Sequence, residues 1–489
     1  MKKRFLNILL VCGLFASCTD LDDVVFSEIN SDKYPENEIQ AQLVTNNAYK
    51  ELKEGIEHGW WNLQTMSGDL VVAPTRGSDW DDGGKWRVLH THEWTNTIAS
   101  INDMWRSVYN GITECNKAIE YLGEGESAQT AVAQMKVLRA YYYYTLIDNY
   151  GDCPYVISFS AAEKQPNKVS RADVYNNIVT DVEASLEFLQ EIDKKTSINK
   201  YTAYALLAKL YINEGVYTGT PNWSKAEEYC DKVIAGPYSL EGDRLAPFKT
   251  LNENSSENIF TIPFDEDSYQ GFLLHRRTLH YNLPPKYDAK TNFWNGFCAQ
   301  PKLVDLFEDG DARAEGLLYG LQYASDGTVI TDGKTGTELN IPKYIDALTV
   351  GGDEFGKMQG ARLVKFEVKN GVKDNLSNDF PLFRLADFML MKAECNLRVK
   401  GNGDATAKQI INTIRTKAGA TAWEDADITL DNLLAERGRE LWCEGHRRQD
   451  LIRFGKFNGA WWEKPAGTSA DNLFPIPQWA VDANPNLGK

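Results

Sequence analysis

The chain has 489 residues, of which 43% are hydrophobic and 25% charged, and its formal net charge at pH 7 is −17. The length fits two to four average domains or one large helical array, and the hydrophobic share is enough for a packed core. The acidic balance argues against a nucleic-acid partner and against adhesion to an anionic membrane through net charge, because both need an excess of lysine and arginine.

The first eighteen residues have the organisation of a secretory signal. Three basic residues at 2–4 precede a mostly apolar stretch, 5–15, which is too short to span about 30 Å of hydrocarbon. The sequence FASC at 15–18 resembles a bacterial lipoprotein signal box, in which the chain is cut before the cysteine. We therefore predict a signal peptide at 1–17 and a lipidated Cys18, which anchors stably if it carries two or more acyl chains. The alternative is an ordinary secreted protein with an incidental cysteine.

Residues 18–35 are predicted to form an acidic tether. The run TDLDD at 19–23 is polar and shows no helical or strand periodicity. Acidic residues directly after a lipidated cysteine resemble the surface-export signal of Bacteroidetes-type lipoproteins, and a plain solvated linker is the alternative interpretation.

Six later segments carry apolar residues at helical spacing. They are 102–122, 131–150, 203–210, 226–233, 386–397 and 407–418. Glycine-containing turns at 215–221 and 401–403 split the last four into two helix pairs that resemble tetratricopeptide repeats. Such pairs bury a continuous core when they stack side by side. We therefore predict a mainly α fold, with one domain over 36–489 built as a tetratricopeptide-like helix-pair scaffold.

Two long segments of irregular composition, about 55–100 and 240–380, interrupt the helices. The first is rich in Gly, Asp and Trp, and the second in Gly, Asn, Pro and aromatic residues, with short strand-like pieces at 259–263 and 361–368. Loops of this length are usually functional, and a rigid scaffold that carries long loops is typical of a binding protein.

No motif in the chain indicates catalysis, a metal or a cofactor, and we predict none of the three. His90 and His92 lack a third fixed ligand, and the acidic run at 79–83 departs from EF-hand spacing. The chain contains no G-x-S-x-G or H-E-x-x-H motif and no nucleotide-binding glycine loop. Carboxylates are numerous, so their number alone does not exclude a pair of catalytic acidic residues such as glycosidases use. The cysteines show no C-x-x-C or zinc spacing, and we expect no structural disulfide.

The C-terminal segment carries the most specific resemblance. Residues 435–455 read AERGRELWCEGHRRQDLIRFG, which resembles the SusD/RagB signature E-R-x-x-E-L-x-x-E-G-x-R-x-x-D-L-x-R-x-G, with Cys443 in place of the usual Phe. Four further stretches agree with the family, namely 139–154, 383–394, 412–419 and 474–486. With the signal box, the resemblance covers essentially the whole chain.

The charges of this signature are predicted to be structural. Glu436, Arg437, Arg439, Glu440 and Glu444 alternate in sign, so pairs at i, i+3 and i, i+4 are available on a helix. Gly445 can take the left-handed conformation that ends a helix. Three of the charged residues that follow, Arg447, Asp450 and Arg453, are expected to lock the next turn into the scaffold.

The resemblance implies a function and partners. Members of this family are cell-surface lipoproteins that bind glycans and serve a SusC-like TonB-dependent transporter, and they are not enzymes. We expect an outer-membrane lipid anchor, an oligo- or polysaccharide ligand whose identity stays open, and no nucleic acid. A protein-binding scaffold or lid without glycan affinity is the first alternative, and a surface glycoside hydrolase is the second, less favoured one.

The candidate ligand residues follow from loop composition, because aromatic rings stack on apolar sugar faces while polar side chains bind hydroxyls. The first loop supplies Arg76, Asp79, Trp80, Asp81, Trp86 and Trp94, and the second supplies Tyr281, Asn282, Asn292 and Trp294, accompanied by His275, Arg276 and Phe293. Each tryptophan could instead pack a loop or contact a partner. Trp105 and Trp442 lie in helical patterns and are expected in the core.

Overall fold

The computed structural model describes residues 38–488, so the predicted signal peptide, Cys18 and the acidic tether lie outside the described residues. The described part is mainly helical, as predicted. None of its helices combines the length and apolar character that crossing a membrane requires.

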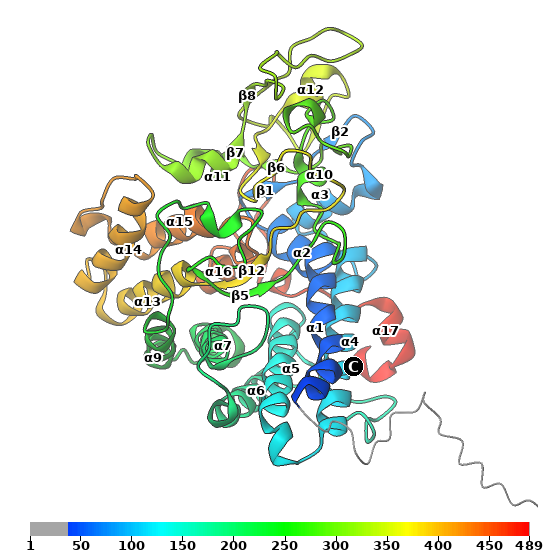
Figure 1. Cartoon of the computed structure of the whole chain (residues 1–489), viewed down its shortest axis with the longest axis vertical. Coiled ribbons are helices and arrows are strands. Elements are labelled where there is room, and N and C mark those ends of the chain that lie inside the picture. Colours follow the sequence, from blue (N-terminus) through cyan, green and yellow to red (C-terminus); the bar gives the residue numbers. More distant parts are fainter. Residues whose placement is uncertain (1–37, 489) are drawn as a thin grey trace, which may run out of the picture.

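Eight helices form a curved layer in which each helix packs on the next. In spatial order they are α1 (Glu38–Glu57), α4 (Ala99–Leu122), α5 (Gln129–Asn149), α6 (Arg171–Ser185), α7 (Lys200–Ile212), α9 (Trp223–Ile234), α13 (Leu385–Lys400) and α14 (Ala405–Lys417). Figure 1 shows this layer along the lower half of the molecule. Because α13 packs directly on α9, the helix-pair array continues across the long second loop, which leaves the layer and returns to it. The predicted helix-pair scaffold is confirmed.

Side-chain caps define where these helices begin. The residue before each first turn places an oxygen on a backbone N–H three residues later, which satisfies a donor that the helix itself leaves unpaired. The capping residues are Ser170 for α6, Asn199 for α7, Asn222 for α9, Asp404 for α14 and Thr429 for α15 (Leu430–Leu441). These caps explain why α7, α9 and α14 start within a few residues of the positions that hydrophobic periodicity predicted.

Short two-stranded ribbons tie the long loops together. The longest pairs β5 (Asn258–Ile262) with β12 (Phe380–Arg384) and closes the base of the second loop. The others join β1 (Val71–Val72) to β6 (Cys298–Ala299), β2 (Thr75–Arg76) to β10 (Thr349–Val350), β3 (Cys153–Pro154) to β4 (Lys168–Val169), β7 (Leu317–Leu318) to β11 (Arg362–Leu363) and β8 (Gly320–Leu321) to β9 (Asn340–Ile341). The β1–β6 and β2–β10 ribbons attach the first loop to the second.

Both loops contain short helices that the irregular composition did not predict. They are α2 (Trp60–Met66), α3 (Lys85–Thr91), α10 (Leu274–Thr278), α11 (Pro301–Leu306) and α12 (Glu354–Met358). Outside the loops, α8 (Glu214–Thr218) fills the predicted turn, α16 (Arg447–Arg453) follows α15, and α17 (Gln478–Ala483) lies near the C-terminus. The stretch containing His90 is helical, and within the strand-like piece predicted at 361–368 only Arg362–Leu363 forms a strand.

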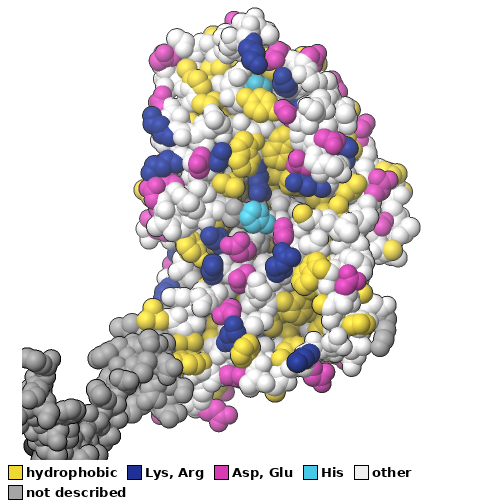
Figure 2. Space-filling view, turned by 90° about the vertical axis from the view of Figure 1, so that its right-hand side faces the viewer, with side chains coloured by type: hydrophobic (Ala, Val, Ile, Leu, Met, Phe, Trp, Pro, Cys, Tyr) yellow, Lys and Arg dark blue, Asp and Glu magenta, His cyan; other side chains and the backbone are white. Residues whose placement is uncertain are grey.

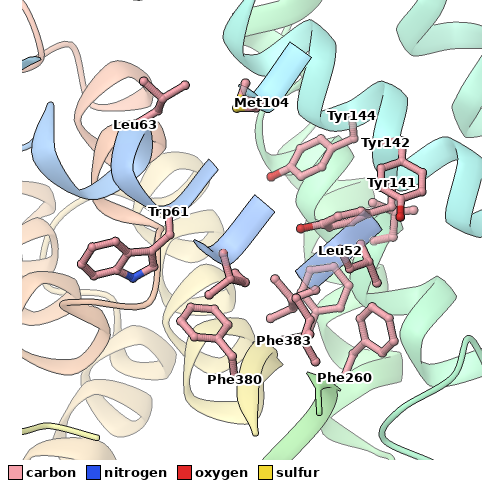
Figure 3. Packing of buried hydrophobic residues seen from close by; sticks show 14 of the residues in the cluster. Leu52, Trp61, Leu63, Met104, Tyr141, Tyr142, Tyr144, Phe260, Phe380 and Phe383 are labelled. Atoms are coloured by element: carbon pink, nitrogen blue, oxygen red, sulfur yellow. The ribbon is translucent and has the colours of Figure 1, made fainter. Parts of the chain in front are cut away.

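The main core lies where the helical layer meets the β5–β12 ribbon. Figure 3 shows Leu52 of α1 among tyrosines of α5 and the phenylalanines of the ribbon, Phe260 and Phe383. Trp105 and Trp442 are buried, as predicted. The six described cysteines are buried and unpaired. A stack between Trp61 of α2 and Phe297, with ring centroids 5.8 Å apart, extends the core into the middle of the second loop.

The signature charges form a buried network that joins distant elements. Glu440 accepts hydrogen bonds from Arg244, Arg313 and Arg384, which come from the second loop and β12. Glu444 lies 2.6 Å from Lys365 Nζ. The expected local pairs are a minority, because most partners are far apart in the sequence.

The turn between α15 and α16 corrects one further expectation. Gly445 has a φ of +79° and is left-handed, as predicted. However, α15 already ends at Leu441, and an irregular turn separates it from α16. Arg447 and Arg453 do lock that turn, because they pair with Asp69 and Glu394 at 2.6 and 2.8 Å.

Candidate functional site

A hollow of about 440 Å³ opens where the two long loops meet. It is lined by Asp79, Trp80, Asp82, Lys85, Trp86, Arg277, Tyr281 and Trp294. Five of the ten ligand-binding candidates therefore lie around one space, although three of the eight lining residues lie more than 190 positions further along the chain than the other five.

Trp80 joins the two loops. Its indole Nε1 donates a hydrogen bond of 2.6 Å to the carbonyl oxygen of Trp294. Its ring lies so close to Gly296 that a Cβ there would stand 2.2 Å from the indole. Trp80 itself has a φ of +59°, which is a strained conformation for a bulky residue. A glycine under the ring and a left-handed backbone are thus both needed to place this tryptophan.

A tight turn after Trp80 sets the second ring of the hollow. Asp82, Gly83 and Gly84 all have positive φ, and α3 begins directly after them. Asp82 accepts a 2.8 Å hydrogen bond from Trp86 Nε1 and lies 3.1 Å from Lys85 Nζ. Partial burial alone would raise the pKa of Asp82, but these two hydrogen bonds outweigh it and hold the pKa below its usual range. The wall therefore carries an ionised carboxylate beside an indole.

Tyr281 and Trp294 form the opposite wall. The Tyr281 hydroxyl donates to Asp79 Oδ2. Burial raises the pKa of Tyr281, and the neighbouring carboxylate adds to the effect, so the phenol stays neutral. The Arg276 guanidinium stacks 4.3 Å from the Trp294 ring centre and pairs with Asp374 at 3.1 Å. Trp294 is therefore held by the Arg276 guanidinium against its ring and by the hydrogen bond that its carbonyl oxygen accepts from Trp80.

Arg76 and Asp81 support the hollow without lining it. Arg76 is 1% exposed and donates to the carbonyl oxygens of Asn295 and Gly356 at 3.1 and 3.0 Å. Asp81 pairs with Arg87 at 2.7 Å.

The three remaining candidates are dispersed. Asn282 Nδ2 donates to Asp332 at 3.3 Å, and Asn292 is exposed beside Arg276. Trp94 packs elsewhere, with its ring 4.7 Å from that of Phe474.

Sequence reasoning missed Asp82, Lys85 and Arg277 in the lining. Each is a direct neighbour in the sequence of a residue named in the loops, namely Asp81, Trp86 and Arg276, and this adjacency was the available signal. Figure 2 looks at the side along which β2 lies in Figure 1 and shows hydrophobic and basic side chains next to one another on its upper half.

The weak metal signals lead to no cluster in the structure. His90 and His92 bond the carbonyl oxygens of Trp462 and Ser67 at 2.8 and 2.9 Å. Within residues 38–488, no group of three or more His, Cys, Asp or Glu side chains is arranged to hold a metal ion. The hollow instead combines flat apolar rings with hydrogen-bonding groups at their edges, which suits a ligand with apolar faces and polar rims.

Two family models match the sequence. The model described as "SusD family" matches residues 331–489, and the model described as "Starch-binding associating with outer membrane" matches residues 26–212. The chain is 28% identical to the starch-binding protein SusD of Bacteroides thetaiotaomicron over 405 residues, which covers 73% of this chain and 72% of that protein. It is 25% identical to the SusD-like protein P25 of Formosa agariphila over 92% of this chain and 90% of the relative.

Solved structures show the same fold. A SusD superfamily protein from Parabacteroides distasonis superposes with a TM-score of 0.75 at 20% identity, covering 94% of this chain and 98% of the other. The surface glycan-binding protein A from Bacteroides thetaiotaomicron, solved in complex with laminarihexaose, gives a TM-score of 0.72 at 22% identity, covering 92% and 98%.

Proposed function

The chain belongs to the SusD/RagB family, and from this premise we propose that it is a non-catalytic lipoprotein on the outer face of the outer membrane that captures a glycan. In this proposal it delivers the glycan to a SusC-like TonB-dependent transporter. The observation that carries the proposal is the hollow, where Trp80, Trp86, Trp294 and Tyr281 surround one space together with charged hydrogen-bonding groups. The names of the relatives support it, since one is a starch-binding protein and another was solved with laminarihexaose.

The geometry suggests how capture works. Trp294 and Trp80 come from different loops but are joined by a hydrogen bond, so the rings are placed before a ligand arrives. Preorganisation of this kind reduces the entropy lost on binding. Asp79, Asp82 and Lys85 supply acceptors and a donor at the ring edges, where sugar hydroxyls would lie. In this proposal the predicted lipid on Cys18 anchors the chain to the outer membrane.

Calorimetric titration of the chain from residue 19 against a panel of oligo- and polysaccharides tests capture. We expect one glycan class to bind without release of smaller products. Trp294→Ala should weaken that binding about tenfold or more, which corresponds to about 1.4 kcal/mol, because it removes a ring from the wall. Trp479→Ala is the matched control, since Trp479 is 42% exposed on α17 and does not line the hollow; its affinity should equal that of the parent.

Three outcomes would contradict the proposal. A folded protein that binds no member of the panel would favour a scaffold or lid. Release of shortened products would favour a hydrolase. Equal binding by Trp294→Ala and the parent would show that the binding site lies elsewhere.

Delivery to a transporter is tested separately. The full-length chain is tagged in its native cell, and the outer-membrane proteins that co-purify with it are identified. Absence of a TonB-dependent transporter among them would contradict the proposed delivery.

A further inference from the structure

Two buried guanidinium groups behind the hollow have no carboxylate partner among residues 38–488. Arg76 is 1% exposed and Arg362 is 0% exposed, and within the described residues neither forms an ion pair. The other fully buried arginines all lie within 4 Å of a carboxylate; these are Arg384, Arg415, Arg437 and Arg448. A buried charge is normally paired, because removing it from water is costly. The two exceptions therefore need an explanation.

Both exceptions converge on the residue next to Trp294. Arg76 Nε donates to the carbonyl oxygen of Asn295 at 3.1 Å, and Arg362 Nη2 donates to its Oδ1 at 2.7 Å. Arg362 Nε donates to the same Oδ1 at 3.2 Å. The remaining hydrogen bonds of the two guanidiniums go to backbone carbonyls in the segment 356–360. Carbonyl dipoles solvate these charges but leave them uncompensated, so the net positive charge remains directly behind the Trp80 and Trp294 wall.

The buried pair stays charged at neutral pH. Burial lowers the pKa of Arg362 to about 9, and repulsion from Arg76 adds to the effect, but this value is still above 7. His280 lies in the same surroundings, and burial together with the two arginines lowers its pKa to about 2. Arg76 Nη2 and His280 Nε2 are both buried polar atoms without a hydrogen-bond partner. The protein thus keeps a cationic, incompletely satisfied region at this position.

The lining of the hollow is itself balanced in charge, because Lys85 and Arg277 stand against the carboxylates of Asp79 and Asp82. Both carboxylates already accept hydrogen bonds, Asp79 from the Tyr281 hydroxyl and Asp82 from Trp86, and Asp82 also pairs with Lys85. The excess positive charge therefore comes from the two buried guanidiniums. The chain as a whole carries −17, so a cationic region runs against its overall balance. Charges separated by protein rather than water interact strongly, which means an anion in the hollow would feel both buried guanidiniums.

We propose that the ligand of this hollow is an acidic glycan, whose carboxylate or sulfate groups supply the negative charge that Arg76 and Arg362 lack. The inference rests on the proposed glycan-binding function and names the substrate class for the same site. The aromatic walls bind the sugar faces, and the cationic region behind them selects glycans that carry anionic substituents.

Matched pairs of polysaccharides test the selection. Oligogalacturonides are titrated beside their carboxyl-reduced form, and a sulfated polysaccharide is titrated beside its desulfated form, at low and at high salt. We expect an acidic member to bind, its neutral counterpart to bind at least about tenfold more weakly, and the acidic affinity to fall as salt screens the charges. Equal or tighter binding of the neutral forms would overturn the proposal and leave the glycan-binding function standing. Binding of no glycan at all would overturn both.

Asn295→Asp gives the site-specific test, because it places a carboxylate between the two guanidiniums with almost no change in shape. The variant should lose about fivefold or more of its affinity for the acidic glycan, and its salt dependence should flatten. If this variant fails to fold by circular dichroism, Lys85→Gln provides the second arm, since Lys85 lies at the surface of the hollow. Lys249→Gln, an exposed cation outside the lining, is the control and should bind as the parent does. Unchanged acidic-glycan affinity in Lys85→Gln and in a folded Asn295→Asp would overturn the proposal.

Discussion

Three residues around the hollow, none of them glycine, hold left-handed backbone conformations. Trp80, Asp82 and Asn295 have φ values of +59°, +41° and +57°. Such conformations cost about 1–3 kcal/mol each and persist only where surrounding contacts over-determine them. Here the contacts are the Trp80–Trp294 hydrogen bond and the bonds from two arginines to Asn295. The local strain therefore coincides with the residues that shape the hollow.

Gly296→Ala tests whether the position of Trp80 matters for binding. The added Cβ would stand 2.2 Å from the Trp80 ring, so the ring must shift. We expect glycan affinity to fall about tenfold and indole fluorescence to change, while the free energy of unfolding falls by only about 1–3 kcal/mol. Gly333→Ala has open space around its Cβ and serves as the control. A Gly296→Ala protein that binds like Gly333→Ala would remove Trp80 from the binding surface.

At the scale of elements, α15 and α16 act as the joint between the helical layer and the second loop. Glu440 on α15 receives arginines from three separate segments, and Arg437 bridges Asp387 of α13 and Asp450 of α16 at 2.8 Å each. The charged residues of the 435–455 signature therefore serve mainly to pair and pack these elements against one another. None of its charged residues lines the hollow.

Glu440→Gln should destabilise the fold strongly. The substitution keeps the shape but leaves Arg244, Arg313 and Arg384 short of a negative charge in the interior, which costs about 3–5 kcal/mol. Chemical denaturation measures this as a lower midpoint. Glu424→Gln removes one partner of the Lys408 pair, in which the Glu424 side chain is 87% exposed, and should change stability by less than about 1 kcal/mol. Similar midpoints for the two variants would show that the buried network contributes little.

At the scale of the whole molecule, folding buries five of the six histidines. Burial is the largest cause in each case and lowers the pKa, to about 4 for His90, His275 and His446, about 3 for His92 and about 2 for His280. His58 is exposed. The folded protein thus holds these five side chains neutral under conditions in which an unfolded chain would protonate them.

Stability should therefore fall as the pH decreases from 7 towards 4. A histidine whose pKa is depressed in the folded state leaves the folding free energy unchanged above its unfolded pKa of 6.5. Below that pH the unfolded chain takes up a proton that the folded chain does not, so stability is lost. Each buried histidine should account for about 1–2 kcal/mol between pH 7 and pH 5. Urea midpoints across this range measure the slope, which His275→Gln should reduce and His58→Gln should leave unchanged. A flat profile would contradict the neutral state of the buried rings.

Periodicity and glycine-containing turns were enough to predict the helix-pair scaffold. These signals depend on residues close in the sequence, so α4, α5, α7, α9, α13 and α14 lie within a few residues of the expected segments. The short helices α2 and α3 were missed, because tertiary contacts rather than local pattern stabilise elements of seven residues. The partners of the signature charges were missed for a related reason, since local spacing says nothing about residues that approach from other elements.

The sequence by itself determined the family, the helix-pair scaffold and the loop composition from which the candidate residues came. Only the tertiary structure decided which candidates share a space, because two ribbons and one indole hydrogen bond bring together loops that lie far apart along the chain. It places Trp94 against Phe474, Arg76 behind the wall, and Lys85 and Arg277 on it. It also decided which buried arginines have no carboxylate partner in the part of the chain that the structure describes, since buried charge pairing depends on contacts between distant segments.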